Sequence, residues 1–338
     1  MKAAVLLEEL INIANTSKTD FALSMNMTPS GLSKILSGKR LPFQKEKKVF
    51  SKQAAAYLAE AIYGYNCYMR FEKIFPIIYD FSSKYELELF LAYALEYALD
   101  KDFAAANNED YDYSDKEISF LGAKAIRNMF CILFSDYLTS EKDSSLKLYS
   151  TLPLFNNYYS DIFGRMKIAG FKKRDNLFFH HFLNLGELES SYDMYNMNVF
   201  SYIIRAQQYG DLNLWMTEDR IKDSFLLLKG RILIFFTIQM DGTPFMSVIT
   251  NKLYLTAFYN FLIKKGAKKI SFNKEEALAA LEADSRYMDI MMEKKIDSVY
   301  NFIPIGHLLA KEELKNIKAS EGLKTWMMEL LQGMLSKE

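Results

Sequence analysis

The sequence predicts a mainly α-helical protein whose C-terminal part is α+β. Apolar residues recur at helical spacing through most of the segment from Ala3 to Phe103. From Ser224 to Thr250, by contrast, β-rich apolar runs alternate with turn signals. The chain has 338 residues, of which 50% are apolar and 15% aromatic, so it is long enough for two or three domains with a substantial core.

We expect four segments along the chain. They are a compact helical domain over residues 1–65, a helical connector over 66–106, a linker over 107–117 and a larger domain over 118–338. The linker is predicted because NNEDYDYSDKE is acidic and aromatic and has no periodicity, although a boundary near Gly64 is an alternative. A 65-residue domain buries a modest core, so it should pack against its neighbour or a second copy.

Two longer helices are predicted to frame the N-terminal domain. Residues 4–14 place Leu6, Leu10 and Ile13 on one face. Residues 44–65 carry a second apolar face, made of Phe50, Ala54, Tyr57, Leu58 and Ala61.

Between them, residues 18–42 predict two short helices joined by a tight turn. Ser17 and Thr19 both stand where an N-cap belongs, and the first helix should run from about residue 18 to 25, with an apolar face of Phe21, Ala22 and Met25. Asn26 should end it, because asparagine tolerates the left-handed conformation. Thr28 followed by Pro29 then signals a new helix, since a hydroxyl caps free amides and proline suits the first helical position.

The second short helix should have a buried and an outward face. The core side is predicted to be Leu32, Ile35 and Leu36, and Gly38 should end the helix. The outward side is predicted to be Ser30, Gly31, Ser33 and Lys34.

This segment resembles the helix-turn-helix of phage repressor and Cro-like regulators. The resemblance covers about residues 1–65 and is carried by Ala22, Thr28, Leu32, Ser33, Ile35, Gly38, Lys39, Arg40 and Pro42. It implies a five-helix, lambda-repressor-like domain that binds double-stranded DNA as a homodimer, with the second helix in the major groove. The DNA-binding residues that the resemblance implies are Thr19, Thr28, Ser30, Gly31, Ser33, Lys34, Lys39 and Arg40.

The chain departs from that family at the helix start and in the turn. The family often has Gln at the start of its first motif helix and Gly in the turn, where this chain has Thr19 and Asn26. Pro29 and Gly31 also remove two side chains that could read bases. Lys34 is therefore the best single candidate for base readout, since lysine can donate to guanine O6 and N7.

Charge favours the same interpretation. Residues 1–52 contain nine basic and four acidic side chains, a balance of +5, whereas the whole chain is neutral. A basic head on a mildly acidic body suits DNA binding by one end. A helical module that uses this fold against protein or RNA is the alternative.

The remainder should form a mixed sheet with helices packed on it. Helices are predicted over residues 118–138, 251–266 and 274–284, and a turn leading into a short helix over 153–166. Residues 224–239 and 245–250 predict strands around the turn at Asp241 and Gly242, and residues 268–273 a short strand.

Catalytic and metal-binding signatures are absent from the sequence, so we expect no enzyme, no metal and no cofactor. His180 and His181 are adjacent and must point in different directions, and His307 is remote in sequence. Cys67 and Cys131 are expected to be buried structural thiols. The remaining candidates have structural explanations: Asp241 with Thr243 in a hairpin turn, and Lys172, Lys173 and Arg174 in an exposed turn.

The sequence thus predicts a one-component transcriptional regulator whose C-terminal domain senses a small molecule or a partner protein. Its candidate pocket residues are Tyr158, Tyr159, Trp215 and Tyr254. The alternatives are a mobile-element repressor with an oligomerising or antirepressor-binding C-terminal domain, and an enzyme with a DNA-targeting head. Lys229 and Arg231 interrupt the most apolar run and no signal peptide is visible, so we expect a soluble bacterial-type cytoplasmic protein without a membrane partner.

Overall fold

The computed structural model of the chain describes residues 1–64, 68–107, 119–139, 145–151, 162–184, 205–206, 208–217, 224–264 and 268–270. The chain forms two compact units. The first comprises Met1–Ser144, Asn157–Phe171 and Phe236–Lys252, and the second comprises Ser145–Asn156, Lys172–Phe235 and Leu253–Glu338. The chain therefore leaves the first unit and returns to it twice before it ends in the second.

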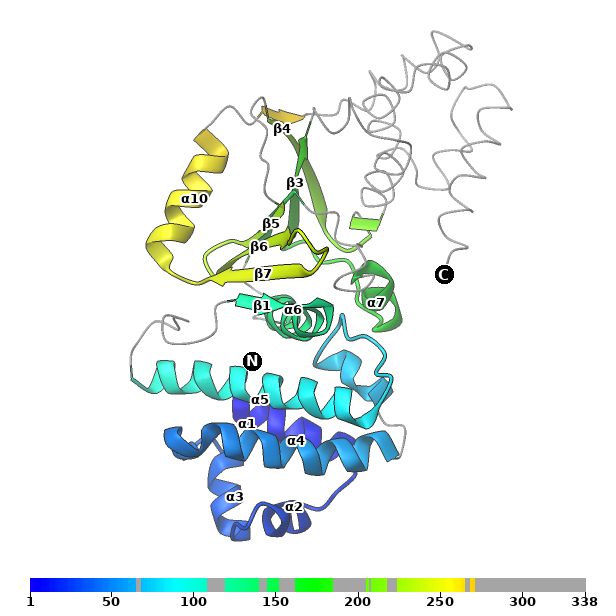
Figure 1. Ribbon diagram of the computed structural model, residues 1–338, viewed down its shortest axis with the longest axis vertical. Helices are drawn as coiled ribbons and strands as arrows, with labels where there is room; N and C mark the ends of the chain where they lie inside the picture. Colours follow the sequence, from blue (N-terminus) through cyan, green and yellow to red (C-terminus); the bar gives the residue numbers. More distant parts are fainter. Residues whose placement is uncertain are drawn as a thin grey trace, which may run out of the picture. The chain divides into compact units, whose positions relative to one another are not determined.

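Helices form most of the first unit (Figure 1). In chain order they are α1 (Ala3–Ile13), α2 (Lys18–Ser24), α3 (Pro29–Leu36), the 3-10 turn η1 (Gln44–Glu46), α4 (Lys47–Gly64), the 3-10 turn η2 (Tyr68–Lys73), α5 (Lys84–Ala106), α6 (Ala123–Leu138) and α7 (Ile162–Ile168). This confirms the predicted helical character of the N-terminal part. No helix in the described ranges is both long enough and apolar enough to span a bilayer.

The predicted faces of α1 and α4 are the ones that the structure buries. Leu6, Leu10 and Ile13 of α1 are all buried. In α4, Phe50, Ala54 and Leu58 are buried, while Tyr57 and Ala61 are half-buried. Residues 1–64 contain four α-helices, and the next helix, α5, lies in the segment predicted as a connector.

Helix α5 packs along α4 and also against α1. Two hydrogen bonds fix its N-terminus: the N-cap Ser83 hydroxyl accepts the Glu86 amide at 3.3 Å, and the Glu86 carboxylate accepts the amide of Ser82, the residue before the cap, at 2.8 Å. The predicted domain boundaries, including the linker over 107–117 that lies almost wholly outside the described residues, stay a prediction.

A buried carboxylate joins α5 and α6. The Asp136 carboxylate of α6 accepts hydrogen bonds at 2.7 Å from the Tyr97 hydroxyl and from the Lys101 ammonium, both on α5. It also contacts the amino group of Met1. Burial alone would raise the pKa of Asp136, but the neighbouring positive charges outweigh it and hold the pKa below its ordinary value.

The second unit contains a mixed β-sheet with the strand order β6-β5-β2-β3-β4-β8. Its strands are β2 (Leu146–Ser150), β3 (Leu177–Asn184), β4 (Asp211–Thr217), β5 (Ser224–Leu228), β6 (Ile232–Ile238) and β8 (Lys268–Ile270). β2, β3 and β4 are parallel neighbours, with Tyr149 opposite His180 and Phe182 opposite Trp215. β5 and β8 pair antiparallel with β2 and β4. The predicted mixed sheet is thus confirmed.

Helix α10 (Lys252–Lys264) packs on one face of this sheet. The ring of Phe258 meets that of Phe225 edge-on with centroids 5.2 Å apart, and Tyr259 meets Tyr149 at 5.3 Å. Because Tyr149 and Phe225 lie on the neighbouring strands β2 and β5, α10 covers aromatic side chains of both strands.

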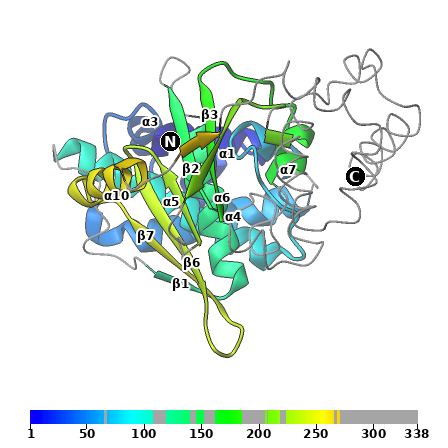
Figure 2. The ribbon, with the colours of Figure 1, turned by 90° about the horizontal axis from the view of Figure 1, so that it is seen from above.

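Two further strands lie next to α6 in the first unit. β1 (Ser119–Leu121) runs antiparallel to β7 (Pro244–Ile249), and α6 contacts both. β6 ends in this unit and turns into β7, and Figure 2 shows these two strands running side by side into their turn. In that turn the Asp241 carboxylate accepts the Thr243 amide at 2.9 Å, as expected for a hairpin.

Two secondary-structure predictions were wrong in detail. Residues 118–138 do not form one helix, because Ser119–Leu121 is strand β1 and Gly122, with a φ of 86°, separates it from α6. Residues 224–239 do not form one strand, because a turn at Gly230, with a φ of 75°, separates β5 from β6. In both places a glycine with a positive φ separates two elements where the sequence analysis expected one.

Candidate nucleic-acid interface

Helix α2 begins at a side-chain cap. The Ser17 hydroxyl accepts the Asp20 amide at 3.0 Å, so Ser17 is the N-cap. Thr19 lies in the first turn of the helix and is exposed. Of the two N-cap candidates, Ser17 is therefore the cap, and Thr19 is an exposed residue of the first turn.

The turn between α2 and α3 has the predicted backbone. Asn26 adopts a φ of 53°, in the left-handed region. The Met27 amide then donates to the Ala22 carbonyl at 2.9 Å, which folds the chain back over the end of α2. Thr28 caps α3, and Pro29 occupies its first turn.

One side of α3 is buried beside α2. Leu32 and Ile35 are 1% and 4% exposed, and Phe21 and Ala22 of α2 are fully buried. Leu36 is only half-buried. The ring of Phe21 contacts Tyr57 of α4 edge-on at 5.6 Å, which connects the helix pair to the rest of the unit.

The other side of α3 is an exposed polar stripe of Ser30, Ser33, Lys34 and Ser37, at positions i, i+3, i+4 and i+7. Residues with this spacing lie on one face of a helix. The Ser37 hydroxyl donates to the Lys34 carbonyl at 3.1 Å, so its side chain folds back on the helix. Ser30, Ser33 and Lys34, which the sequence predicts to face outward, thus lie on one exposed face of α3.

Gly31 was predicted on the outward face of α3, but it is partly covered. It is half-buried, and its amide donates to the Thr28 hydroxyl at 3.1 Å. A Cβ added at Gly31 would stand 3.1 Å from the same Thr28 Oγ1, closer than ordinary van der Waals contact. The small size of Gly31 thus leaves room for the cap, a role that the sequence pattern did not suggest.

The chain leaves α3 through a short basic segment. Gly38 has a φ of 71°, and the Arg40 amide donates to the Lys34 carbonyl at 3.1 Å, so Arg40 is held against the end of the helix. The guanidinium of Arg40 lies 5.1 Å from the ring centre of Phe43, which is 63% exposed. Cation–π contact of this kind orients a side chain at a surface. The sequence analysis did not predict Phe43 as part of this surface. Its position three residues after Arg40 was the only sequence feature that could have indicated the contact.

Charge around this segment is one-sided. Residues 21–45 contain no acidic side chain but four basic ones, Lys34, Lys39, Arg40 and Lys45. Two neighbouring lysines are already paired, Lys18 with Glu8 and Lys47 with Asp100, both at 2.5 Å. The positive charge of residues 21–45 is therefore concentrated at the C-terminal end of α3 and just beyond it.

The histidines do not assemble a site within the described part of the chain. His181 is fully buried in β3, and burial lowers its pKa to about 4. His180 on the opposite face accepts a hydrogen bond from Trp215 Nε1 at 3.1 Å. His307 lies outside the described residues. No cluster of three potential metal ligands occurs among the residues that are described.

The other candidates have structural places. Cys131 is buried, and burial raises the pKa of its thiol to about 12. Trp215 stacks on Phe182 with ring centres 6.0 Å apart, and Tyr254 is 48% exposed on α10. Lys172 and Lys173 are exposed and Arg174 half-buried. Cys67, Tyr158 and Tyr159 lie outside the described residues.

Comparisons of the chain with protein-family models, with curated proteins and with solved structures yield no match.

Proposed function

We propose that the chain is a sequence-specific DNA-binding transcriptional regulator and that α2, the turn and α3 are its lambda-repressor-like DNA-reading element. The observation that supports this best is the exposed stripe of Ser30, Ser33 and Lys34 on a short capped helix, next to the basic exit. A recognition helix needs such a stripe, because polar side chains on its outer face must reach base edges in the major groove.

The residues would divide into two roles. Lys34 would donate to guanine O6 and N7, with Ser30 and Ser33 beside it on the base edges. Lys39 and Arg40 would contact phosphates and fix the register. Thr19 and Thr28, exposed at the starts of the two helices, would contribute phosphate contacts from their hydroxyls and nearby amides.

Because α3 has few side chains that can read bases, we expect two copies of the DNA-binding element to act together. A single α3 offers three polar side chains to the bases, so the protein would bind as a homodimer to two half-sites about 34 Å apart along one face of the DNA. The part of the chain after residue 118 would then bind a small molecule or a partner protein and change how the two heads are spaced.

Binding of fluorescent genomic DNA fragments, followed by anisotropy at several salt concentrations, tests this proposal. Lys34→Ala and Arg40→Ala should each weaken binding, and Arg40→Ala should reduce the slope of log affinity against log salt by about 1. Lys73→Ala is the matched control, since Lys73 is an exposed lysine of η2 in the same unit. Undiminished binding by Lys34→Ala and Arg40→Ala would reject the proposed surface.

A further inference from the structure

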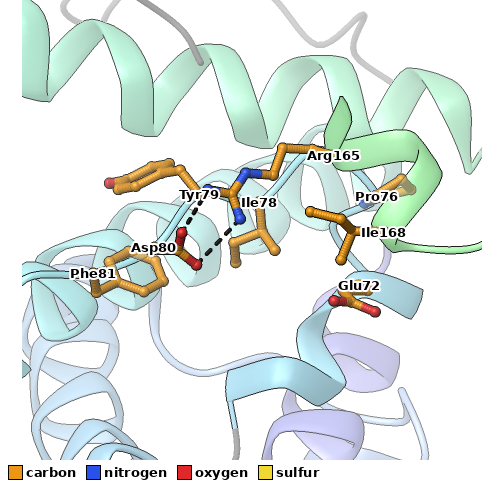
Figure 3. A pocket seen from close by; sticks show the side chains of 8 residues that line it. All are labelled: Glu72, Pro76, Ile78, Tyr79, Asp80, Phe81, Arg165 and Ile168. Carbon is orange, nitrogen blue, oxygen red and sulfur yellow. Dashed lines mark hydrogen bonds and ion pairs between the residues drawn. The ribbon is translucent and has the colours of Figure 1, made fainter. Parts of the chain in front are cut away.

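The first unit contains a cavity of about 200 Å³, remote in sequence from the helix-turn-helix (Figure 3). It lies between α7 and the segment that links η2 to α5. An apolar cavity of about 150 Å³ is enough to hold a benzene ring. The cavity therefore has room for one ring or a short aliphatic chain.

Most of the cavity wall is apolar and fixed. Pro76, Ile78 and Phe81 line it, and each is buried. Ile168 of α7 also lines it but is 57% exposed, so apolar surface remains open to solvent at the rim. A ligand that covered Ile168 would gain free energy from removing that surface from water.

A bidentate ion pair stands at the same cavity. The two terminal guanidinium nitrogens of Arg165, Nη1 and Nη2, donate to the Asp80 carboxylate at 3.1 and 2.6 Å (Figure 3). The two partners differ in exposure, with 24% of the Arg165 side chain and 71% of the Asp80 side chain open to solvent. The Arg165 guanidinium is thus largely covered by the protein at the cavity, whereas the Asp80 carboxylate that pairs with it is largely exposed to solvent.

The backbone on both sides of Asp80 is anchored, so its side chain is the adjustable part. The Tyr79 hydroxyl donates to the Asn128 side chain of α6. The Tyr79 and Phe81 rings lie 6.2 and 5.4 Å from Phe90 of α5. Asp80 can therefore turn its exposed carboxylate into water without disturbing the wall.

We propose that this cavity binds a small organic monocarboxylate, whose carboxylate takes the place of Asp80 on Arg165 and whose apolar part lies against Pro76 and Ile168. The planar guanidinium fork favours a carboxylate, which it can bind in two parallel hydrogen bonds. Glu72 lines the same cavity and disfavours a second negative charge on the ligand. This site does not depend on the DNA-binding proposal.

Isothermal titration of the full-length protein with benzoate, cyclohexanecarboxylate and hexanoate tests this site. Ligands of this size should bind with a Kd of about 10 mM or better. Benzamide should bind at least about tenfold more weakly than benzoate, because it lacks the charge that Arg165 recognises. Phthalate, which carries two carboxylates, should also bind more weakly than benzoate because of Glu72.

Two variants separate the roles of the pair. Arg165→Gln should lower benzoate affinity at least about tenfold. Asp80→Asn should raise it several-fold, because the competing carboxylate is gone, and a loss of folding cannot produce a gain in affinity. Lys84→Gln is the matched control: it breaks the Lys84–Glu60 pair of the same unit, whose side chains are 34% and 70% exposed, and should leave binding unchanged.

Each contrary result overturns the proposal. Equal binding of benzamide and benzoate would mean that the guanidinium does not select the ligand. Weaker benzoate binding by Asp80→Asn would mean that the Asp80 carboxylate is not a competitor. Failure of all three monocarboxylates to bind both the wild type and Asp80→Asn would remove the site altogether.

Discussion

Removal of the Thr28 hydroxyl should loosen α3 selectively. Thr28 Oγ1 accepts the Gly31 amide at 3.1 Å and lies 3.2 Å from the Ser30 hydroxyl, and among the described residues no other side chain caps the start of α3. Loss of a threonine N-cap costs about 1 kcal/mol. That free energy corresponds to about fivefold faster exchange of amide hydrogens that open with α3.

Thr19→Ala is the matched control, because it removes the same atoms from a threonine one helix earlier. Ser17, not Thr19, caps α2. Alanine also has the higher helix propensity, by up to about 0.7 kcal/mol. Exchange in α2 should therefore be unchanged or slightly slower in Thr19→Ala.

Gly31→Ala sharpens the same test through a double-mutant cycle. Alanine in place of glycine within a helix gains about 0.8–1 kcal/mol. In the wild type the new Cβ would crowd Thr28 Oγ1 at 3.1 Å, which offsets part of that gain. In the Thr28→Ala background the crowding is gone, so Gly31→Ala should stabilise α3 more there than in the wild type.

Hydrogen exchange of the full-length protein, followed by mass spectrometry of peptides that cover residues 18–27 and 28–37, measures both helices separately. Two results would refute the capping argument: equal exchange of α3 in wild type and Thr28→Ala, or strictly additive effects of Thr28→Ala and Gly31→Ala. Peptides from α5 should exchange at the wild-type rate in every variant.

Three further predictions concern the packing of the first unit. Leu32→Ala should lower the free energy of unfolding by about 2–5 kcal/mol, measured by urea denaturation, because Leu32 is 1% exposed. Tyr97→Phe should cost about 1–3 kcal/mol in the same assay, since it removes a donor from the buried Asp136 carboxylate. Because the folded-state pKa of Asp136 lies below its ordinary value of 3.8, its contribution is complete above that value and is lost as the pH falls through the folded-state pKa. Acid unfolding profiles of wild type and Asp136→Asn should therefore converge at low pH, and parallel profiles would contradict this.

Local rules were sufficient to predict the backbone of α2, α3 and the turn between them. Thr28 with Pro29, Asn26 and Gly38 each have a backbone preference that acts within a few residues, and all of them behave as these preferences require. Spacing alone predicted the buried positions Leu32 and Ile35, whereas Leu36 is only half-buried. The place of Gly31 did not, because it depends on how closely the Thr28 hydroxyl approaches.

The parallel strands escaped prediction for a physical reason. β3 reads LFFHHFLN, and a buried parallel strand of this kind lacks the alternation of polar and apolar residues that marks a half-exposed strand. Its neighbours β2 and β4 pair with β3 on opposite sides, and this register depends on segments that are distant in the sequence. Short apolar runs of this length do not distinguish a strand from a buried helix.

The candidate carboxylate site was beyond sequence reasoning as well. Asp80 and Arg165 are separated by 85 residues and lie in segments with no shared motif. Only the packing of α7 against the segment before α5 brings them together. Conversely, the aromatic residues that the sequence suggested as pocket candidates were predicted from residue type alone, without any spacing pattern. Of these, Trp215 packs against His180 and Phe182.

Selection of bound sequences from a random DNA pool tests the central proposal most directly. The wild type should enrich a pseudo-palindromic motif with half-sites about one helical turn apart. Lys34→Ala should lose base preference at one position in each half-site, while Lys73→Ala should recover the wild-type motif. Enrichment of no motif, or of the same motif with undiminished preference by Lys34→Ala, would contradict the assignment of α3 as the recognition helix.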